Sequence, residues 1–323
     1  MKLRTKMVLG AILLAALPLT LASALIGLNA INQSTAELES EAENKLVAIR
    51  DMKRQQIEEY FDTIRNQVLT FSNDTMVINA MVAFSGALGH FRSQAEAEFL
   101  DEARIDEMRR DLSGYYRTDF TDRYRDLNHG QSPDADRLLS QLDPESIALQ
   151  YYYIQDNRHP LGEKDGLMAA GDDSDYSRLH AQYHPHIRDF QNKFGYYDIF
   201  LADPETGDIV YSVFKELDYT TSLKDGPYAQ SGIGRVFRKA NAADDPAFVA
   251  VEDFQPYKPS YEGAASFIAS PIFDGGEKVG VLIFQMPIGR INEIMTHRGQ
   301  WKESGLGDSG ETYLVGTDRK SVV

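Results

Sequence analysis

The sequence predicts an α+β protein in which long helices precede an antiparallel sheet. Two pairs of short β-prone runs indicate the sheet, because each pair flanks a cluster of turn-forming residues. The runs occupy residues 194–201, 209–214, 265–273 and 278–286. Residues 226–243, between the pairs, contain a short helical stretch. Two hairpins joined by a helix-bearing connection predict an antiparallel sheet with one face covered.

Composition excludes several partners. The chain has 49 acidic and 33 basic residues and a formal net charge of −16. Binding to nucleic acid or to an anionic membrane surface needs clustered Lys and Arg, so nucleic acid is not an expected partner. The chain has no cysteine, which excludes disulfides and thiolate chemistry.

The amino terminus predicts a membrane span. Residues 1–6 carry three basic side chains and no acidic one, and the 22 residues 7–28 carry no charge. A helix of about 20 apolar residues crosses a bilayer, and basic residues before it place residues 1–6 in the cytoplasm. The alternative is a cleaved signal peptide, for which Ala22 to Ala24 offers a site, but the apolar run exceeds the usual length of about 7–15 residues. Both interpretations export the rest of the chain.

A long helix is predicted to follow the span. From Ile31 to Phe71 apolar residues recur at spacings of three and four. Neither glycine nor proline interrupts residues 31–84, which predicts one helix of about 80 Å at 1.5 Å per residue. Its apolar stripe needs a partner. The stripe could pack against the protein's own sheet and helices. It could also form a parallel homodimer seam near the membrane, and both can hold at different heights of the helix.

Shorter helices are predicted between the long helix and the sheet. Gly86 to Gly89 predicts a break, and residues 162–174 predict a polar loop. Pro185 is expected at or near a helix start. Helical regions are predicted at 94–126, 138–156 and 176–194.

The sequence offers little that indicates catalysis. His180, His184 and His186 form the one histidine cluster, but no cysteine and no His-Glu-x-x-His arrangement accompany them, so hydrogen-bonded or solvated histidines are expected and no metal. The glycines near Gly226 lack a phosphate-binding fingerprint. Nucleophile elbows and kinase signatures are absent from the sequence. We therefore expect a protein that is not an enzyme and needs no cofactor.

A cluster of tyrosines and charged residues after the first hairpin indicates a ligand pocket. Aromatic walls with a few convergent charges are typical of sites for small polar ligands, and Lys or Asp can pair with a carboxylate or an ammonium group. The alternative is that the tyrosines cap the sheet edge and the charges are solvated. The candidate ligand-binding residues are Tyr211, Lys215, Asp218, Tyr219, Tyr228, Asp253, Tyr257 and Tyr261.

These features together resemble a known family. Residues 196–212 read Tyr-Tyr-Asp-Ile-Phe-Leu-Ala-Asp-Pro-Glu-Thr-Gly-Asp-Ile-Val-Tyr-Ser. With the basic amino terminus, the span and the long helix, this hairpin resembles the double-Cache sensor region of bacterial methyl-accepting chemotaxis proteins. Further matching stretches are Lys215-Glu216, 221–223, 226–228, Ser231-Gly232, 268–273 and 280–287.

The resemblance implies an architecture and a location. Two stacked PAS-like (Cache) modules on a long helix are expected, outside the cytoplasm and anchored in the inner membrane. The expected segments are a cytoplasmic terminus at 1–6, a transmembrane helix at 7–28, a helical region at 29–193, the membrane-distal module at 194–290, and a linker with the start of the proximal module at 291–323. Gly305 to Val315 resembles the opening strand of that module. A second span, a HAMP linker and a signalling coiled coil are expected beyond Val323, so the chain is expected to be a fragment or a truncated product.

The resemblance also implies a function, namely small-molecule sensing for chemotaxis. The same sensors occur on histidine kinases and diguanylate cyclases, and a domain that recognises a periplasmic binding protein is a further alternative. The amino-acid-binding pattern of such sensors joins Tyr, Arg, Trp and Tyr closely, but the one tryptophan here is Trp301, outside the distal module. The expected ligand is therefore a small polar molecule of open class.

Overall fold

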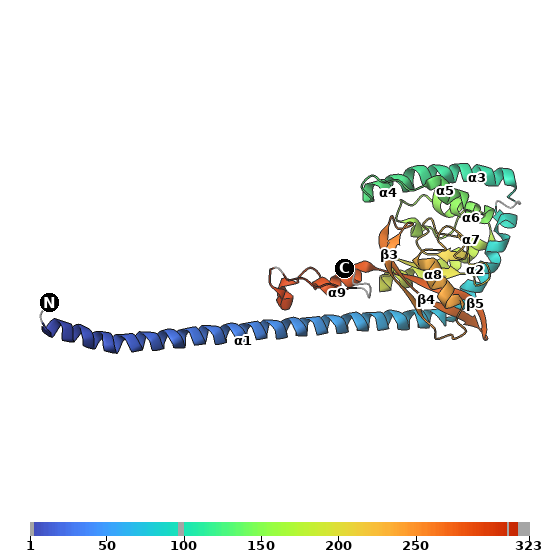
Figure 1. Cartoon of the computed structure of the whole chain (residues 1–323). Coiled ribbons are helices and arrows are strands. Elements are labelled where there is room, and N and C mark those ends of the chain that lie inside the picture. The colour runs from blue at the N-terminus through green and yellow to red at the C-terminus, as the bar shows by residue number, and fades with distance from the viewer. Residues whose placement is uncertain (1–2, 96–99, 309, 316–323) are drawn as a thin grey trace. The chain divides into compact units, whose positions relative to one another are not determined.

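The computed structural model describes residues 3–95, 100–308 and 310–315, which divide into two compact units. The first, here called the stalk unit, holds the chain up to Glu58 together with residues from Glu293 onward. The second, the sheet unit, holds Glu59–Asn292. Helix α1, Leu3–Ser72, contributes to both (Figure 1).

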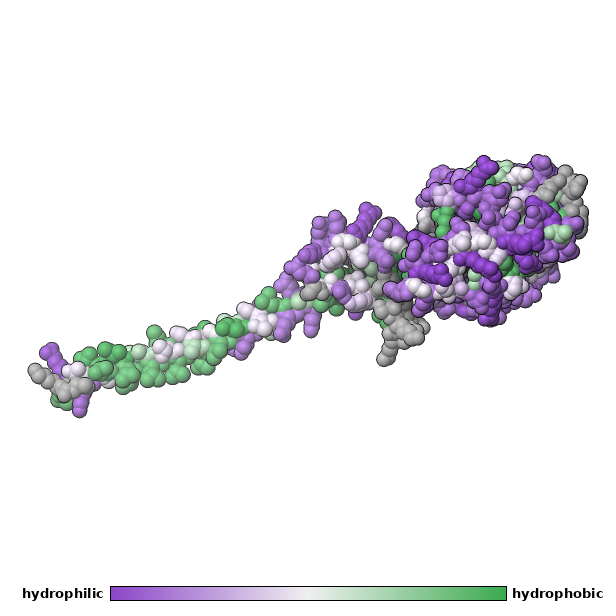
Figure 2. Space-filling view, turned by 90° about the horizontal axis from the view of Figure 1, so that it is seen from above, coloured by the Kyte–Doolittle hydropathy of each residue, from purple (hydrophilic) through white to green (hydrophobic). Residues whose placement is uncertain are grey.

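The predicted apolar stretch lies within α1 in the stalk unit. The helix runs through residues 7–28 without a break, with Pro18 inside it, and the apolar side chains of this stretch are exposed. Figure 2 shows them as a continuous apolar surface. By length and composition this part of α1 is able to cross a membrane.

Residues around Ile294 contact α1 within the stalk unit. The Lys53 ammonium donates a hydrogen bond to the carbonyl of Ile294 in α9, Ile288–Thr296. A π-helical turn, Lys302–Leu306, follows. Residues 310–315, where the sequence places an opening strand, hold a lone bridge residue at Val315 and no strand. The start of a second module stays a prediction, and residues 316–323 lie outside the described residues.

The sheet unit contains a five-stranded antiparallel sheet, which confirms the predicted α+β class with a PAS-like sheet module. The strands are β1 Asp198–Ala202, β2 Ile209–Ser212, β3 Ala250–Tyr257, β4 Gly263–Asp274 and β5 Glu277–Met286, in the order β2-β1-β5-β4-β3. Both predicted hairpins are present, as β1–β2 and β4–β5. Strand β3 was not predicted.

Helices cover both faces of this sheet, not one as the sequence suggested. Helix α8, Gly232–Asn241, packs on β3, β4 and β5 beside Phe267. The opposite face carries Phe284, whose ring lies 6.0 Å from Phe71 in α1. Helices α2, Thr75–Gln94, and α7, Asp175–Phe194, also contact the sheet (Figure 1). Both faces are therefore buried, and polar side chains of the strands must find partners inside the unit.

Three helix boundaries differ from prediction. The expected helix over 31–84 ends at Ser72, because Asp74 caps a new helix, α2 Thr75–Gln94, by accepting a hydrogen bond from the Met76 amide. The glycines predicted to break the chain near Gly86 lie inside α2. Pro185 lies inside α7, Asp175–Phe194, which begins after its cap Ser174.

Short helices fill the region between α2 and α7. They agree with the predicted helical regions 94–126 and 138–156, apart from residues 96–99, which lie outside the description. The polar loop predicted at 162–174 is confirmed, with one 3-10 turn. The elements are α3 Glu102–Tyr115, η2 Tyr116–Phe120, α4 Thr121–Leu127, α5 Ala135–Ser140, α6 Pro144–Gln150, η3 Tyr151–Gln155 and η4 Lys164–Gly166.

Close packing at the start of α8 gives a testable prediction. A Cβ at Gly234 would clash with the backbone carbonyl of Ala229, whereas a Cβ at Gly86 in α2 meets no heavy atom within 4 Å. We expect Gly234→Ala to lower the free energy of unfolding by about 1–3 kcal/mol. Gly86→Ala should raise it by about 0.5–1 kcal/mol through helix propensity. Urea unfolding of both variants checks this, and equal effects would contradict the packing.

Candidate functional site

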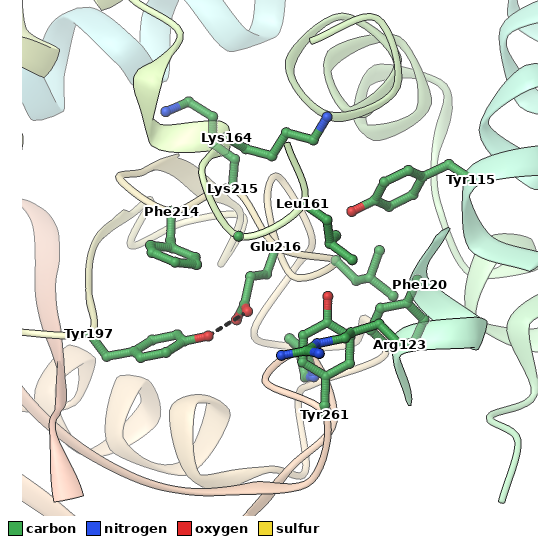
Figure 3. Close-up of a pocket in the computed structure, with 13 residues that line it drawn as sticks. Tyr115, Phe120, Arg123, Leu161, Lys164, Tyr197, Phe214, Lys215, Glu216 and Tyr261 are labelled. Carbon is green, nitrogen blue, oxygen red and sulfur yellow. Dashed lines mark hydrogen bonds between the residues drawn. The ribbon is translucent and has the colours of Figure 1, made fainter. Parts of the chain in front are cut away.

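A cavity of about 390 Å³ lies in the sheet unit between the helical layer and the loops that follow the strands. Figure 3 shows side chains from separate stretches of the chain around it. The helical layer, the 161–164 loop, the residue before β1, the segment after β2 and the β3–β4 turn each contribute. The lining residues are Tyr115, Phe120, Arg123, Leu161, Gly162, Lys164, Tyr197, Phe214, Lys215, Glu216, Leu217, Pro259 and Tyr261.

Most of the charged residues in the lining are basic. They are Arg123, Lys164 and Lys215, and the acidic one is Glu216. Arg123 is exposed at the cavity edge. Within the part of the chain that the structure describes, Arg123 has no carboxylate partner. The Lys164 ammonium donates a hydrogen bond of 2.6 Å to the Asn157 carbonyl and lies 5.9 Å from the Tyr115 ring centroid. Burial lowers the pKa of Lys164.

Two tyrosine hydroxyls reach the cavity without a protein partner. In Figure 3 the hydroxyls of Tyr115 and Tyr261 point toward the same space as the Glu216 carboxyl. Neither hydroxyl makes a hydrogen bond to another described residue. Burial raises the pKa of both, with the neighbouring Glu216 adding to the rise. Both are therefore neutral phenols able to donate a hydrogen bond to a bound molecule.

The Glu216 carboxyl is already hydrogen-bonded within the protein. Its oxygens accept bonds from the Tyr197 hydroxyl at 2.7 Å and the Ser260 hydroxyl at 2.9 Å. Burial raises the pKa of Glu216 well above its usual range, and the nearby Asp218 raises it further. This side chain is consequently held toward its neutral form and offsets little of the basic charge around it.

A buried polar network lies next to Glu216. Asp198 accepts three backbone hydrogen bonds at one oxygen, from the amides of residues 199, 213 and 214. Asp218 accepts a 2.5 Å bond from the Tyr257 hydroxyl. The other carboxyl oxygen of each aspartate and the amide oxygen of Gln285 are buried without a donor. Burial raises the pKa of Asp198 well above its usual range and that of Asp218 to about 6.

Lys215 connects the cavity to this network. It is 1% exposed and has a φ of 58°, a strained backbone conformation for a residue with a side chain. Its ammonium donates a 2.9 Å hydrogen bond to the Val213 carbonyl. Burial lowers the pKa of Lys215 to about 7, while Asp198 and Asp165 oppose this and Arg188 adds to it. The side chain is thus a buried amine, which is uncommon.

Helix α7 holds the loop beside the cavity. The Arg188 guanidinium pairs with the Asp165 carboxylate at 2.6 Å. His184 contacts the Asp165 carbonyl through Nε2 and the Tyr211 hydroxyl through Nδ1, both at 2.7 Å. A carbonyl only accepts, so Nε2 carries the proton and Nδ1 accepts from the tyrosine. Burial lowers the pKa of His184 to about 2, with Lys215 contributing, which keeps this ring neutral.

The rest of the histidine cluster makes no metal site, although Nε2 of His180 is buried without a hydrogen-bond partner among the described residues. The rings of His180 and His184 stack with centroids 4.3 Å apart. Nδ1 of His180 contacts the Met168 carbonyl at 2.6 Å, so both histidines anchor the loop that follows the cavity lining. His186 is exposed. In the described residues no group of three or more metal-ligating side chains is assembled.

The structure separates the eight predicted ligand-binding residues into four places. Lys215 and Tyr261 line the cavity. The neighbouring buried network contains Asp218, Tyr228 and Tyr257. In the core, Tyr211 contacts His184 and the Tyr219 hydroxyl contacts Tyr176 at 2.7 Å. Asp253 is exposed on β3.

Sequence reasoning missed most of the cavity's polar lining. Tyr115 and Arg123 come from the helical layer and Lys164 from the 161–164 loop, all upstream of the sheet. Glu216 lies within the predicted cluster and Tyr197 precedes it, but neither is among the eight candidate ligand-binding residues. One local signal was available, because Tyr115 ends α3 and Tyr116 begins η2, a short distance before Arg123 in α4.

Comparisons with known proteins give weak matches. No protein-family model matches the chain, and no curated protein matches its sequence. Among solved structures it is similar to the sensor domain of the V. cholerae histidine kinase DctB, with 15% identity and a TM-score of 0.28 over 60% of this chain and 59% of that one. It is also similar to the ligand-binding domain of the Pseudomonas fluorescens chemoreceptor CtaA in complex with L-isoleucine, with 12% identity and a TM-score of 0.27 over 74% and 68%. The chain thus spans less than two thirds of the first of these.

Proposed function

We propose that this chain is the extracytoplasmic small-molecule sensing portion of a membrane-anchored chemoreceptor and is not an enzyme. The observation that carries the proposal is the cavity of about 390 Å³. Its lining includes the Arg123 guanidinium and the hydroxyls of Tyr115 and Tyr261, which have no hydrogen-bond partner among the described residues. A concave site with apolar walls and a few convergent polar groups is the usual form of a small-ligand site. The apolar stretch of α1 supports membrane anchoring, with the sensor in the periplasm.

A continuous set of contacts supports signalling from the cavity to α1. Lys164 lines the cavity, and the next residue, Asp165, pairs with Arg188 of α7. Further along α7, Phe190 stacks on Phe71 of α1 with ring centroids 4.0 Å apart. A ligand that favours one position of the 161–165 loop would therefore favour one arrangement of α7 against α1. The coupling free energy equals the difference between the ligand's binding free energies for the two arrangements.

A chemoreceptor differs from a histidine kinase or a diguanylate cyclase in the signalling domain that α1 would control. A histidine kinase or diguanylate cyclase would use the same ligand site, so it differs in the attached catalytic domain alone. A domain that recognises a periplasmic binding protein needs no small-molecule site. The hydroxyls of Tyr115 and Tyr261, which point into the cavity and have no hydrogen-bond partner among the described residues, favour direct binding over that last alternative.

A ligand screen on the full chain in detergent micelles tests direct sensing. Organic acids, amides, amines, amino acids and purines are added singly, and the melting temperature is measured. A ligand that binds only the native state raises the melting temperature. At a free ligand concentration of about a hundred times Kd, it adds about 2.7 kcal/mol to the free energy of unfolding. We expect at least one class to do so.

Leu161→Trp provides the matched variant, because Leu161 is a half-buried residue of the cavity lining. The larger ring should fill the cavity and abolish the ligand-induced shift while the unliganded protein still melts cooperatively. Val82→Trp, at an exposed position of α2, is the control and should retain the shift. If no compound shifts the wild type, or if Leu161→Trp still responds fully, direct sensing in this cavity is wrong.

A further inference from the structure

We infer that the cavity selects a small organic carboxylate with an apolar body, an inference that rests on the proposed sensing function. The first support is charge. Three of the four charged side chains in the lining are basic, although the chain as a whole carries a net charge of −16. A local reversal of the overall charge sign, placed at a cavity, attracts anions.

Arg123 is the anchoring residue in this assignment. Arg123 lines the cavity, and its charge opposes the rise in the pKa of Tyr261. Within the described residues it pairs with no carboxylate. By contrast Arg125, on the same helix α4, bonds to the Ser132 hydroxyl at 2.7 Å and faces Asp122 at 3.5 Å. An arginine left open at a cavity offers a planar fork of donors that matches a carboxylate.

Further donors surround the same space. Lys164 adds a positive charge to the lining, although its ammonium donates to the Asn157 carbonyl. The hydroxyls of Tyr115 and Tyr261 add two neutral donors directed inward. Phe120 and Phe214 line the cavity as apolar surfaces. The set therefore suits one anionic group attached to an apolar or aromatic body.

The one acidic side chain does not favour a cationic ligand. Both oxygens of Glu216 accept hydrogen bonds, from Tyr197 and Ser260. Its pKa is also raised, so a ligand ammonium would meet a carboxyl held toward neutrality. An amine would at the same time lie among basic side chains. The contacts thus disfavour amines on both counts.

Titration calorimetry on the full chain in micelles tests the ligand class with compounds matched in shape. Benzoate, butyrate and succinate are each compared with their amide and amine counterparts, and inorganic phosphate is included. We expect one or more carboxylates to bind, with amides and amines at least tenfold weaker. Affinity should fall as salt is raised, because the attraction is between charges at a partly exposed site.

Arg123→Gln and Arg125→Gln form the matched pair of variants, since both are exposed on α4. Arg123→Gln should raise the Kd for the carboxylate ligand by about ten- to hundredfold, because it removes a charge-assisted hydrogen bond. Arg125→Gln should leave its Kd unchanged, and circular dichroism verifies that both variants fold.

The outcomes separate this inference from the proposed function. Binding of amides or amines in preference to carboxylates overturns the carboxylate assignment and leaves sensing intact. A preference for phosphate would exclude the apolar body, and an unchanged Kd in Arg123→Gln would exclude the anchoring role. If no compound of any class binds a folded chain, both the inference and direct sensing fail.

Discussion

Replacing Lys215 with methionine is expected to remove a rise in stability between pH 7 and pH 9. Burial lowers the pKa of Lys215 from about 10.5 to about 7, so the native state loses this proton before the unfolded chain does. Across the window the unfolded state binds more protons, and raising the pH therefore stabilises the native state. One proton over one pH unit corresponds to about 1.4 kcal/mol, which gives a rise on the order of 2–3 kcal/mol.

Neighbouring groups do not reverse this sign. His180 and His184 have lowered pKa values and are neutral throughout the window. The Lys215 charge lowers the pKa of Asp198, so its removal raises that pKa and makes the variant lose more stability as the pH rises. The Asp198 effect therefore has the same sign as the Lys215 effect, and it enlarges the difference in stability between wild type and variant at high pH.

Urea unfolding at several pH values measures the difference in free energy of unfolding between wild type and Lys215→Met. The exposed Lys224 supplies the control variant, Lys224→Met, whose difference from wild type should stay nearly constant. Parallel curves for wild type and Lys215→Met from pH 7 to pH 9 would show that Lys215 keeps an ordinary pKa and is not the buried amine described above.

The strands that were predicted differ in kind from the one that was missed. Strands β4 and β5 are central and consist mostly of buried apolar residues, so short apolar runs next to turns identified them. Strand β3 lies at the sheet edge, alternates buried and exposed residues and contains Pro256. Proline and polar residues are tolerated at an edge because one side of the strand needs no ladder partner. A local pattern therefore identifies β3 poorly.

The helix boundary at Asp74 was missed for a related reason. The absence of glycine and proline predicts a continuous helix, but an aspartate cap ends one helix and begins the next without either residue. The converse error occurred at Gly86, which is tolerated in α2 because glycine weakens a helix by only about 1 kcal/mol.

The candidate site was predicted in part because its residues come from distant segments. The stretch after β2 supplied Lys215, and the β3–β4 turn supplied Tyr261, both near a predicted hairpin. Arg123 and Lys164 stand on a short helix and a loop whose position over the sheet depends on the packing of the whole helical layer. No local pattern places them, so the basic character of the cavity became visible only in the folded chain.

Asp218→Asn is expected to remove a loss of stability between pH 4 and pH 6. Burial raises the pKa of Asp218 from about 3.8 to about 6, so its contribution is fully favourable below pH 4. As the pH rises toward 6 the native state retains a proton that the unfolded chain has released, and stability falls. The loss in the wild type should be on the order of 2–3 kcal/mol.

Asparagine is the suitable replacement because it keeps an oxygen to accept the Tyr257 hydroxyl while it cannot ionise. The difference in free energy of unfolding between Asp218→Asn and wild type should therefore change in favour of the variant from pH 4 to pH 6. Asp225→Asn, at an exposed position of the same connection, is the control. A difference that does not vary with pH would mean that Asp218 ionises normally in the native state. The buried network would then need a donor for the second Asp218 oxygen that the described residues do not supply.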